Sequence, residues 1–339
     1  MKTKRKVSYA TVLLILAVTL ILTMIGSIVL GRYPIGLREL GGILASKVVK
    51  TEPYWSATQE ALLLKHRLPR IILACLVGCC LSAAGVAYQG VFQNPMAAPD
   101  ILGASSGAAF GAALAILLDL GSTMIMVFAF AASLLTVGIV IYTGERARGK
   151  RSLGLILSGI MIGSLVSSGT SFIKLVADPE DQLPAITYWL MGSLNGTSPE
   201  DVLFVLLPMG MGLLLLLLLR WRINVLTLGD EEARTMGVHA GRLRILVILC
   251  ATLITAASVS VSGVIGWVGL VIPHLTRRMV GNNYKYLMPA SMLFGAIFLL
   301  LVDNISRNLL ATEIPIGILT SLIGAPFFIF LMSRDGERI

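Results

Sequence analysis

The chain contains 339 residues, of which 56% are hydrophobic and 13% are charged. Ordinary soluble domains are about half apolar and about a quarter charged, so this composition excludes a soluble enzyme, a disordered chain and a secreted disulfide scaffold. Basic residues number 27 and acidic residues 18, but the charges fall between apolar runs, where they suit lipid headgroups and topology better than a nucleic-acid surface.

Ten apolar runs follow one another along the chain. Each is expected to form a helix, because bilayer hydrocarbon cannot satisfy free backbone groups. The first run follows a basic start and is too long for a signal peptide, so it is expected to be a retained span. The runs lie near residues 7–31, 69–92, 101–118, 123–144, 152–173, 201–220, 243–262, 264–280, 287–310 and 314–333. The sequence therefore predicts an all-α, polytopic membrane protein with a single domain over residues 1–339.

The distribution of basic residues predicts the orientation. Ten spans place both termini on one side, and most of the lysines and arginines fall in the inner segments if that side is the cytosol. We therefore expect both termini to be cytosolic. The predicted outer segment 32–70 is also basic, which suggests that its charges have a partner.

A weak internal repeat accompanies these runs. The stretch 82–86 resembles 255–259, the same offset pairs 90–91 with 263–264, and Pro99 and Pro273 fall almost in register. The two copies run in opposite directions through the membrane in the predicted topology, as in the inverted repeats of many transporters. Small residues are common in membrane helices, so chance similarity stays open.

Two stretches look like catalytic motifs but lack what the chemistry needs. Residues 144–151 nearly spell a phosphate-binding loop, yet the Ser or Thr that would hold magnesium is missing. Residues 103–107 spell GxSxG, but they open a membrane helix, and nothing brings His274 to Ser105 as a base. The four cysteines match neither a zinc site nor a redox pair: Cys75, Cys79, Cys80 and Cys250. No catalytic residue and no metal site are predicted.

Residues 229–238 are predicted to form a short helix outside the bilayer, between two spans. Its acidic start favours a helix N-terminus, and Gly237 is a natural stop. Such a helix could dock into a groove on another protein, or it could be a capped surface loop.

Three further segments stand out. In residues 93–100 two prolines block a continuous helix, which predicts either a simple turn or a constriction at the inner mouth of a pathway. Residues 263–278 look like a short helix that descends to the inner face, with His274 as a structural hydrogen-bonder. Asp303 and Arg307 are four residues apart near the outer end of a span, so they could neutralise each other, although charged residues in spans are also candidates for function.

Taken together, these segments resemble the FecCD/BtuC family, the permease subunits of type II ABC importers for ferric siderophores, haem and cobalamin. The matching pieces are 66–70, 94–97 with Pro99 and 102–103, 229–237, 268–270 with Pro273, His274 and Arg277, and 313–317 with 324–326. Two departures are visible. Met96 stands where the family usually has Leu, and Ala98 stands where an acidic residue is usual.

The resemblance implies roles for particular residues. It implies that a coupling helix seated in an ATPase contains Gly229, Asp230, Glu231, Glu232, Ala233, Arg234 and Gly237. It implies an inner gate at Asn94, Pro95, Met96 and, with a looser alignment, Ser152. It implies that Arg67, Arg70 and Arg307 meet acidic residues of a substrate-binding protein, which would explain the basic outer segment. It marks as structural motif residues Pro99, Gly103, Pro273, His274, Arg277, Pro315 and Gly317.

The resemblance also implies the assembly and the function. Ten helices per subunit, two permeases (a second copy or a paralogue), two cytosolic ATPases and a binding protein are expected in a bacterial inner membrane. The chain would not be an enzyme and would bind no cofactor, because ATP and magnesium belong to the ATPase. A ferric siderophore is the first choice of cargo, with haem and cobalamin next.

Two other classes of function stay open. An ion-coupled secondary transporter would fit the repeat and the Asp303–Arg307 pair, but it would leave 229–237 without a purpose. An intramembrane enzyme would require a reactive Ser105.

Overall fold

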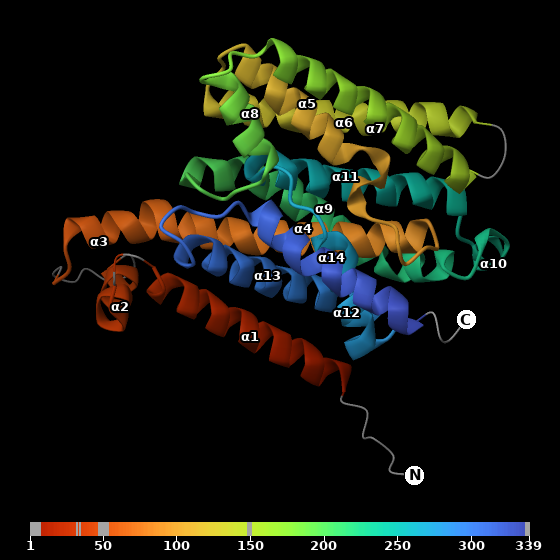
Figure 1. The fold of residues 1–339 in the computed structure, drawn as a ribbon. Helices are drawn as coiled ribbons and strands as arrows, with labels where there is room; N and C mark the ends of the chain where they lie inside the picture. Colours follow the sequence, from red (N-terminus) through yellow and green to blue (C-terminus); the bar gives the residue numbers. More distant parts are fainter. Residues whose placement is uncertain (1–7, 32, 34, 47–53, 148–150, 336–339) are drawn as a thin grey trace.

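A computed structural model of the chain describes residues 8–335 apart from 32, 34, 47–53 and 148–150. All regular structure in these residues is helical, which confirms the predicted fold class. The long helices are α1 (Tyr9–Val29), α4 (Leu68–Val91), α6 (Ser122–Arg146), α7 (Arg151–Val176), α9 (Pro199–Leu226), α11 (Ala240–Ser262) and α13 (Tyr284–Asn308). They lie side by side along one direction, with α1 at one edge and α5, α6 and α7 at the other (Figure 1).

Shorter elements connect them. They are α2 (Leu37–Ser46), α3 (Ala57–Ala61), the π-helical turn η1 (Leu62–Arg67), the 3₁₀ turn η2 (Pro99–Leu102), α5 (Ala104–Leu117), α8 (Gln182–Leu190), α10 (Asp230–Thr235), α12 (Val268–Val280) and α14 (Ile316–Asp335). Seven helices in the described part of the chain are long and apolar enough to cross a membrane by length and composition. The other three predicted runs coincide with α5, α12 and α14. Helix α5 and the apolar part of α14, Ile316–Phe330, are shorter apolar helices, and α12 has 13 residues.

Two predicted runs begin later as helix than the apolar pattern suggests. The run near 101–118 starts in η2 and reaches α5 only after Gly103, whose φ is +75°. The run near 264–280 becomes helical only at Val268, because Gly263 and Trp267 have φ values of +65° and +70°. Left-handed backbone interrupts a helix regardless of how apolar its side chains are.

Helix α9 is longer than the predicted run 201–220. It begins at a capping box in which Ser198 and Asp201 bond to each other's backbone N–H, and it continues to Leu226. The prediction stopped at the first arginine of the helix, but Arg220 and Arg222 lie near its end, where long basic side chains reach out of the apolar layer.

Helix α4 forms the centre of the fold and is the most buried of the apolar spans. It packs against α9, α11, α12 and α13. A Cβ atom on Gly85 would lie 1.8 Å from the carbonyl oxygen of Gly269, and one on Gly78 would lie 2.2 Å from that of Gly295. The backbone of α4 therefore touches the backbones of α12 and α13, an approach that only glycine permits.

Paired contacts fix the relative directions of the helices. The hydroxyls of Tyr88 and Thr252 lie 3.0 Å apart, and the Ser82 hydroxyl donates to the Ser291 carbonyl at 2.8 Å. The Ser82–Ser291 and Gly78–Gly295 contacts show that α4 runs antiparallel to α13. The Tyr88–Thr252 pair and the bond from Arg244 to the Val91 carbonyl show the same for α4 and α11. Because α4 and α11 are each followed by a broken segment and a short helix, the arrangement matches the predicted inverted repeat.

The bundle has two ends that matter for function. One contains Arg70 and Arg307 and is called the arginine end here. The other contains α10 and is called the α10 end. Figure 1 shows α10 far from α2, α3 and α8, with the start of α1 and the end of α14 on the same side as α10.

Candidate functional site

Helix α10 projects from the α10 end between α9 and α11. It is flanked by Gly229 (φ +129°) and Gly237 (φ +76°). Both φ values are positive, and glycine adopts positive φ more readily than other residues, so both predicted glycines lie where the backbone requires them. Ala233 is fully buried, whereas the side chains of Glu231, Glu232 and Arg234 are exposed. The helix therefore rests on the bundle through one face and presents charged groups on the other.

Arg244, the residue that holds α10 in place, was not predicted from the sequence. This arginine is 4% exposed and lies in the first turns of α11. Its Nη2 donates to Asp230 Oδ1 at 2.8 Å, and its Nε donates to the carbonyl of Val91 at 3.4 Å. Arg244 thus joins the start of α10 to the end of α4. The sequence did offer one signal, since an arginine close to an apolar span is unusual. Its partner Asp230 lies 14 residues earlier, however, so helical spacing does not predict the pair.

A second link joins α4 to the segment before α10. Gln93 follows α4 with a φ of +51°, and its Nε2 donates to the carbonyl of Leu226, the last residue of α9, at 2.6 Å. The predicted gate residues follow directly. Asn94 Oδ1 accepts from the backbone N–H of Met96 at 2.9 Å, and Met96 is 43% exposed. The gate segment, residues 94–103, which contains the predicted gate residues Asn94, Pro95 and Met96, therefore directly follows a residue that is bonded to the end of α9.

The same segment touches two further helices. The ring of Pro99 lies against Gly269 of α12, and the carbonyl of Ile101 lies against Gly159 of α7. Ser152, in the first turn of α7, is half-buried, and no hydrogen bond among the described residues joins it to Asn94 or Met96. Its role in the gate stays a prediction.

Replacing Arg244 with alanine is expected to lower the free energy of unfolding by about 1–3 kcal/mol, because it leaves a carboxylate and a buried carbonyl without their donor. Arg244→Lys should recover only part of this loss, since a single ammonium does not reproduce the planar group whose separate nitrogens reach Asp230 and the Val91 carbonyl. Thermal unfolding of the purified protein measures the effect, with the exposed Arg222→Ala as control. Equal unfolding temperatures for Arg244→Ala and wild type would contradict the link.

The arginine end holds a network of buried charges. Arg70 Nε donates to Asp303 Oδ1 at 2.9 Å, and its two terminal nitrogens donate to the two oxygens of Glu313 at 3.0 and 2.9 Å. Arg307 Nε lies 3.1 Å from Asp303 Oδ2, which confirms the predicted pair four residues apart. Two arginines therefore share the carboxylate of Asp303. Because Asp303 is fully buried, this carboxylate is shielded from water.

The three arginines predicted to dock a binding protein are buried, not spread on the surface. Arg67, Arg70 and Arg307 are 6%, 8% and 9% exposed. Arg67 donates to the carbonyls of Ile28 and Tyr33, so one of its functions is to hold the end of α1. All three line a cavity of about 280 Å³. Docking stays a prediction, and it would require an acidic side chain that enters this cavity.

The residues that the resemblance marked as structural lie at breaks and contacts of the backbone. Gly103 separates η2 from α5, while Pro273, His274 and Arg277 lie within α12. Pro315 precedes α14, and a Cβ on Gly317 would lie 2.3 Å from the carbonyl of Met191. Gly317 therefore lets the start of α14 approach the end of α8. Of the segment that resembles a phosphate-binding loop, residues 148–150 lie outside the described residues.

Comparison with known proteins gives consistent matches. The model of the FecCD transport family matches residues 18–334. The molybdate import system permease protein MolB of Haemophilus influenzae is 40% identical over 336 residues, which cover 97% of this chain and 98% of that protein. A probable iron chelatin transport system permease protein of Helicobacter pylori strain 26695 is 41% identical over 273 residues, covering 80% and 82% of the two chains. Other relatives are named as cobalamin and hemin permeases.

A solved structure is similar over nearly the whole chain. It is an ABC transporter described as of metal-chelate type, in an inward-facing conformation. The TM-score is 0.86 at 38% sequence identity, over 96% of this chain and 99% of that one. The resemblance that the motifs indicated is confirmed.

Proposed function

Because this chain belongs to the FecCD transport family and is a permease subunit of a type II ABC importer, we propose that it forms the membrane path for an iron chelate. A binding protein would deliver the chelate, and separate ATPases would drive its transport. The observation that carries the proposal is α10. This helix exposes charged side chains and is tied by Arg244 to the end of α4, and Gln93 ties the same region to the gate segment.

The mechanism follows from these contacts. An ATPase that grips α10 would move the α9–α10 junction, and Gln93 would pass this movement to the gate segment 94–103. That segment contacts both α7 and α12, so displacement of α10 would reach two membrane helices at once. The chain itself performs no bond chemistry in this scheme, and ATP and magnesium stay on the partner.

A second permease subunit would complete the path. Helix α7 carries a row of exposed serines, namely Ser164, Ser167, Ser168 and Ser171, of which Ser168 and Ser171 donate to carbonyls one turn earlier in the same helix. Hydroxyls on a membrane helix favour contact with another helix or with water over contact with lipid. We propose that a second copy or a paralogue faces α7 across the path, and that each of the two chains contributes one permease domain.

The chain is a multi-pass membrane protein, and we propose that the α10 end faces the bacterial cytosol. The start of α1 and the end of α14 would then both be cytosolic, as the distribution of basic residues predicts. The cavity lined by Arg67, Arg70 and Arg307 would face the binding protein.

Molybdate is a second candidate cargo. The specific observation in its favour is the molybdate permease of Haemophilus influenzae, which is similar over 97% of this chain. Haem and cobalamin are further alternatives from the same family.

One experiment tests the partner and the cargo together. The complete transporter in vesicles is expected to take up a radiolabelled ferric siderophore. Glu232→Ala with Arg234→Ala should reduce uptake and binding-protein-stimulated ATPase activity at least about tenfold, because both side chains are exposed on α10 and would meet the ATPase. Within the described residues, the Glu232 carboxylate lies only against the backbone of Gly229 at the exposed start of the same helix. The unfolding temperature should not change. Glu200→Gln, an exposed acid at the opposite end, is the control.

Full uptake by the double variant would contradict the role of α10. Uptake of labelled molybdate but not of the ferric chelate would assign the second cargo instead. Uptake by the chain alone, with no ATPase present, would favour an ion-coupled transporter.

A further inference from the structure

The three buried arginines of the arginine end converge on one cavity. Arg67 Nη1 donates to the carbonyl of Ile28 at 2.5 Å, and Arg307 Nη2 donates to the hydroxyl of the preceding residue, Ser27, at 2.8 Å. Arg70 follows Arg67 by three residues in the chain. All three side chains line the cavity of about 280 Å³, so three positive charges meet around a small volume.

The charges around this cavity do not balance. Arg70 directs its three nitrogens to the carboxylates of Asp303 and Glu313. Asp303 Oδ2 also lies 3.1 Å from Arg307 Nε, but the two atoms are not aligned for a hydrogen bond. Arg67 is bonded to backbone carbonyls and has no carboxylate partner within the described residues. In this part of the chain, three guanidinium groups therefore share two carboxylates.

The imbalance has a physical cost. Arg67 is 6% exposed, and a buried charge without a partner of opposite sign strongly destabilises a fold. Among the residues that the structure describes, Nε of Arg67 and Nη1 of Arg307 donate no hydrogen bond. The cavity thus offers one excess positive charge together with N–H groups that can still donate, which is the combination that an anion requires.

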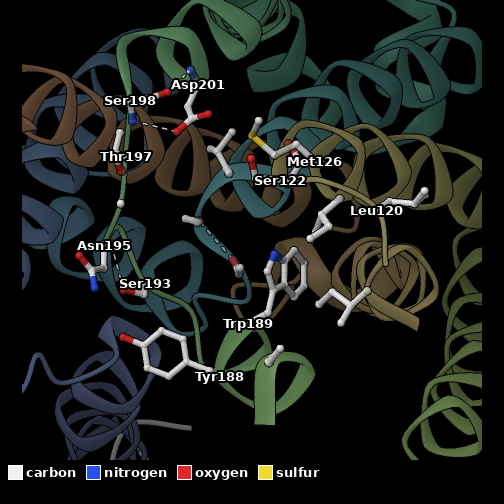
Figure 2. Close-up of a pocket in the computed structure, with 18 of the residues that line it drawn as sticks. Leu120, Ser122, Met126, Tyr188, Trp189, Ser193, Asn195, Thr197, Ser198 and Asp201 are labelled. Carbon is white, nitrogen blue, oxygen red and sulfur yellow. Dashed lines mark hydrogen bonds between the residues drawn. The ribbon is translucent and has the colours of Figure 1, made fainter. Parts of the chain in front are cut away.

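The cavity is open to dissolved ions. Exposed side chains line it, among them Tyr33, His66, Asn195 and Asn308. Asn195 lies on the loop between this cavity and its neighbour beside α8, and Figure 2 shows its side chain pointing away from Trp189 of the neighbouring cavity. A docked binding protein would supply a carboxylate only while it is bound, so the excess charge needs another partner at other times.

We propose that this cavity binds a small monovalent inorganic anion, such as chloride, beside the guanidinium groups of Arg67 and Arg307. One negative charge balances the excess, whereas a divalent anion would reverse it. A water molecule occupies about 30 Å³ in the liquid, so the cavity has room for the ion and part of its water shell. The site depends on the charges of this chain alone, so it exists whether or not the chain carries an iron chelate.

Two asparagines in the cavity wall allow a test that leaves the arginines in place. Asn195→Asp adds a carboxylate of nearly the same shape, and within the described residues the side chain of Asn195 makes no hydrogen bond that the change would break. Asn308→Asp adds a carboxylate from the end of α13 on another wall. Either carboxylate should supply the missing negative charge from within and take the place of the anion.

The first measurement is chloride binding by the intact transporter, purified in detergent without a binding protein. Chloride replaces gluconate at constant ionic strength, and the width of the chlorine NMR line reports the bound ion. Wild type should show saturable binding. Asn195→Asp and Asn308→Asp should each weaken it about tenfold or more, the order of one charge-assisted hydrogen bond. Thr58→Asp, an exposed change on α3 outside the cavity, is the control and should bind like wild type.

The unfolding temperature gives a second readout. Wild type should unfold at a higher temperature in chloride than in gluconate, because a bound ion stabilises the folded state. In gluconate, Asn195→Asp should be more stable than wild type, a gain that a merely structural role of Asn195 would not produce. Arg67→Met would also remove the site, but it loses the bonds that hold the end of α1, so the aspartate variants are the sharper test.

Absence of saturable chloride binding in wild type would overturn the proposal, as would equal binding by wild type and both aspartate variants. Neither readout involves uptake of cargo. A transporter that carries molybdate, haem or cobalamin would therefore still give a clear answer about the anion site.

Discussion

Replacing Asp303 with asparagine is expected to lower the free energy of unfolding by about 3–5 kcal/mol, because it removes the shared partner of two buried arginines. Asp303 is fully buried, and its two oxygens face Arg70 and Arg307. The asparagine has nearly the same shape, so the loss reports charge and not packing. Arg70 would keep Glu313, but Arg307 would remain buried without a carboxylate.

Matched variants identify the cause. Glu313→Gln should cost less, since that side chain is 22% exposed and water can replace part of the interaction. Combining Asp303→Asn with Arg307→Met should cost less than the sum of the two single changes, because the second change removes the stranded cation.

Thermal unfolding in detergent, followed with a thiol-reactive fluorescent dye, gives the measurement. The four free cysteines are buried or half-buried, so they react when the fold opens. An unfolding temperature for Asp303→Asn equal to that of wild type would show that the network contributes nothing.

Replacing Gly85 with alanine should be still more damaging. The new Cβ would lie 1.8 Å from the carbonyl oxygen of Gly269. This contact is with backbone, which cannot change rotamer, so α4 and α12 would have to separate. Overpacking a core with one methyl group usually costs about 1–3 kcal/mol, and a clash between backbones should exceed that range, leaving little folded protein in the membrane.

Gly138→Ala is the matched control for this variant. Gly138 lies in the middle of α6, also within a membrane helix, and a Cβ there would have no neighbour within 4 Å. Its yield and unfolding temperature should equal or slightly exceed those of wild type. The yield of protein in a monodisperse size-exclusion peak compares the two. Equal behaviour of both variants would mean that α4 and α12 do not approach as closely as described.

The apolar runs located the long helices because each span must bury its backbone and cover its length with apolar side chains. Hydropathy carries no information about backbone conformation. It therefore missed the break at Trp267 and the later start of α12. It also missed α8, a helix of nine residues that lies in a stretch too polar and too short to read as a span.

The residues of the candidate site also fall into two groups: those that helical spacing predicts and those that only the packing of the helices brings together. The pair of Asp303 and Arg307 was predictable, since one helical turn separates the two residues. Its third member, Arg70, lies 233 residues from Asp303 in the sequence, and only the packing of α4 on α13 brings them together. The burial of Arg70 and Arg307 follows from that packing, and the sequence of a basic outer segment gives no sign that its arginines are buried.

The contacts of α4 with α12 and α13 have a mechanical consequence. Helices separated by side chains can slide, because the side chains change rotamer and absorb the displacement. Bare backbone at Gly78 and Gly85 leaves no such compliance, so α4 has to shift as a stiff rod of 24 residues, about 36 Å long. One tip of that rod carries Arg70, and the other is bonded to Arg244 through Val91. A tilt imposed at either tip would therefore also displace the other.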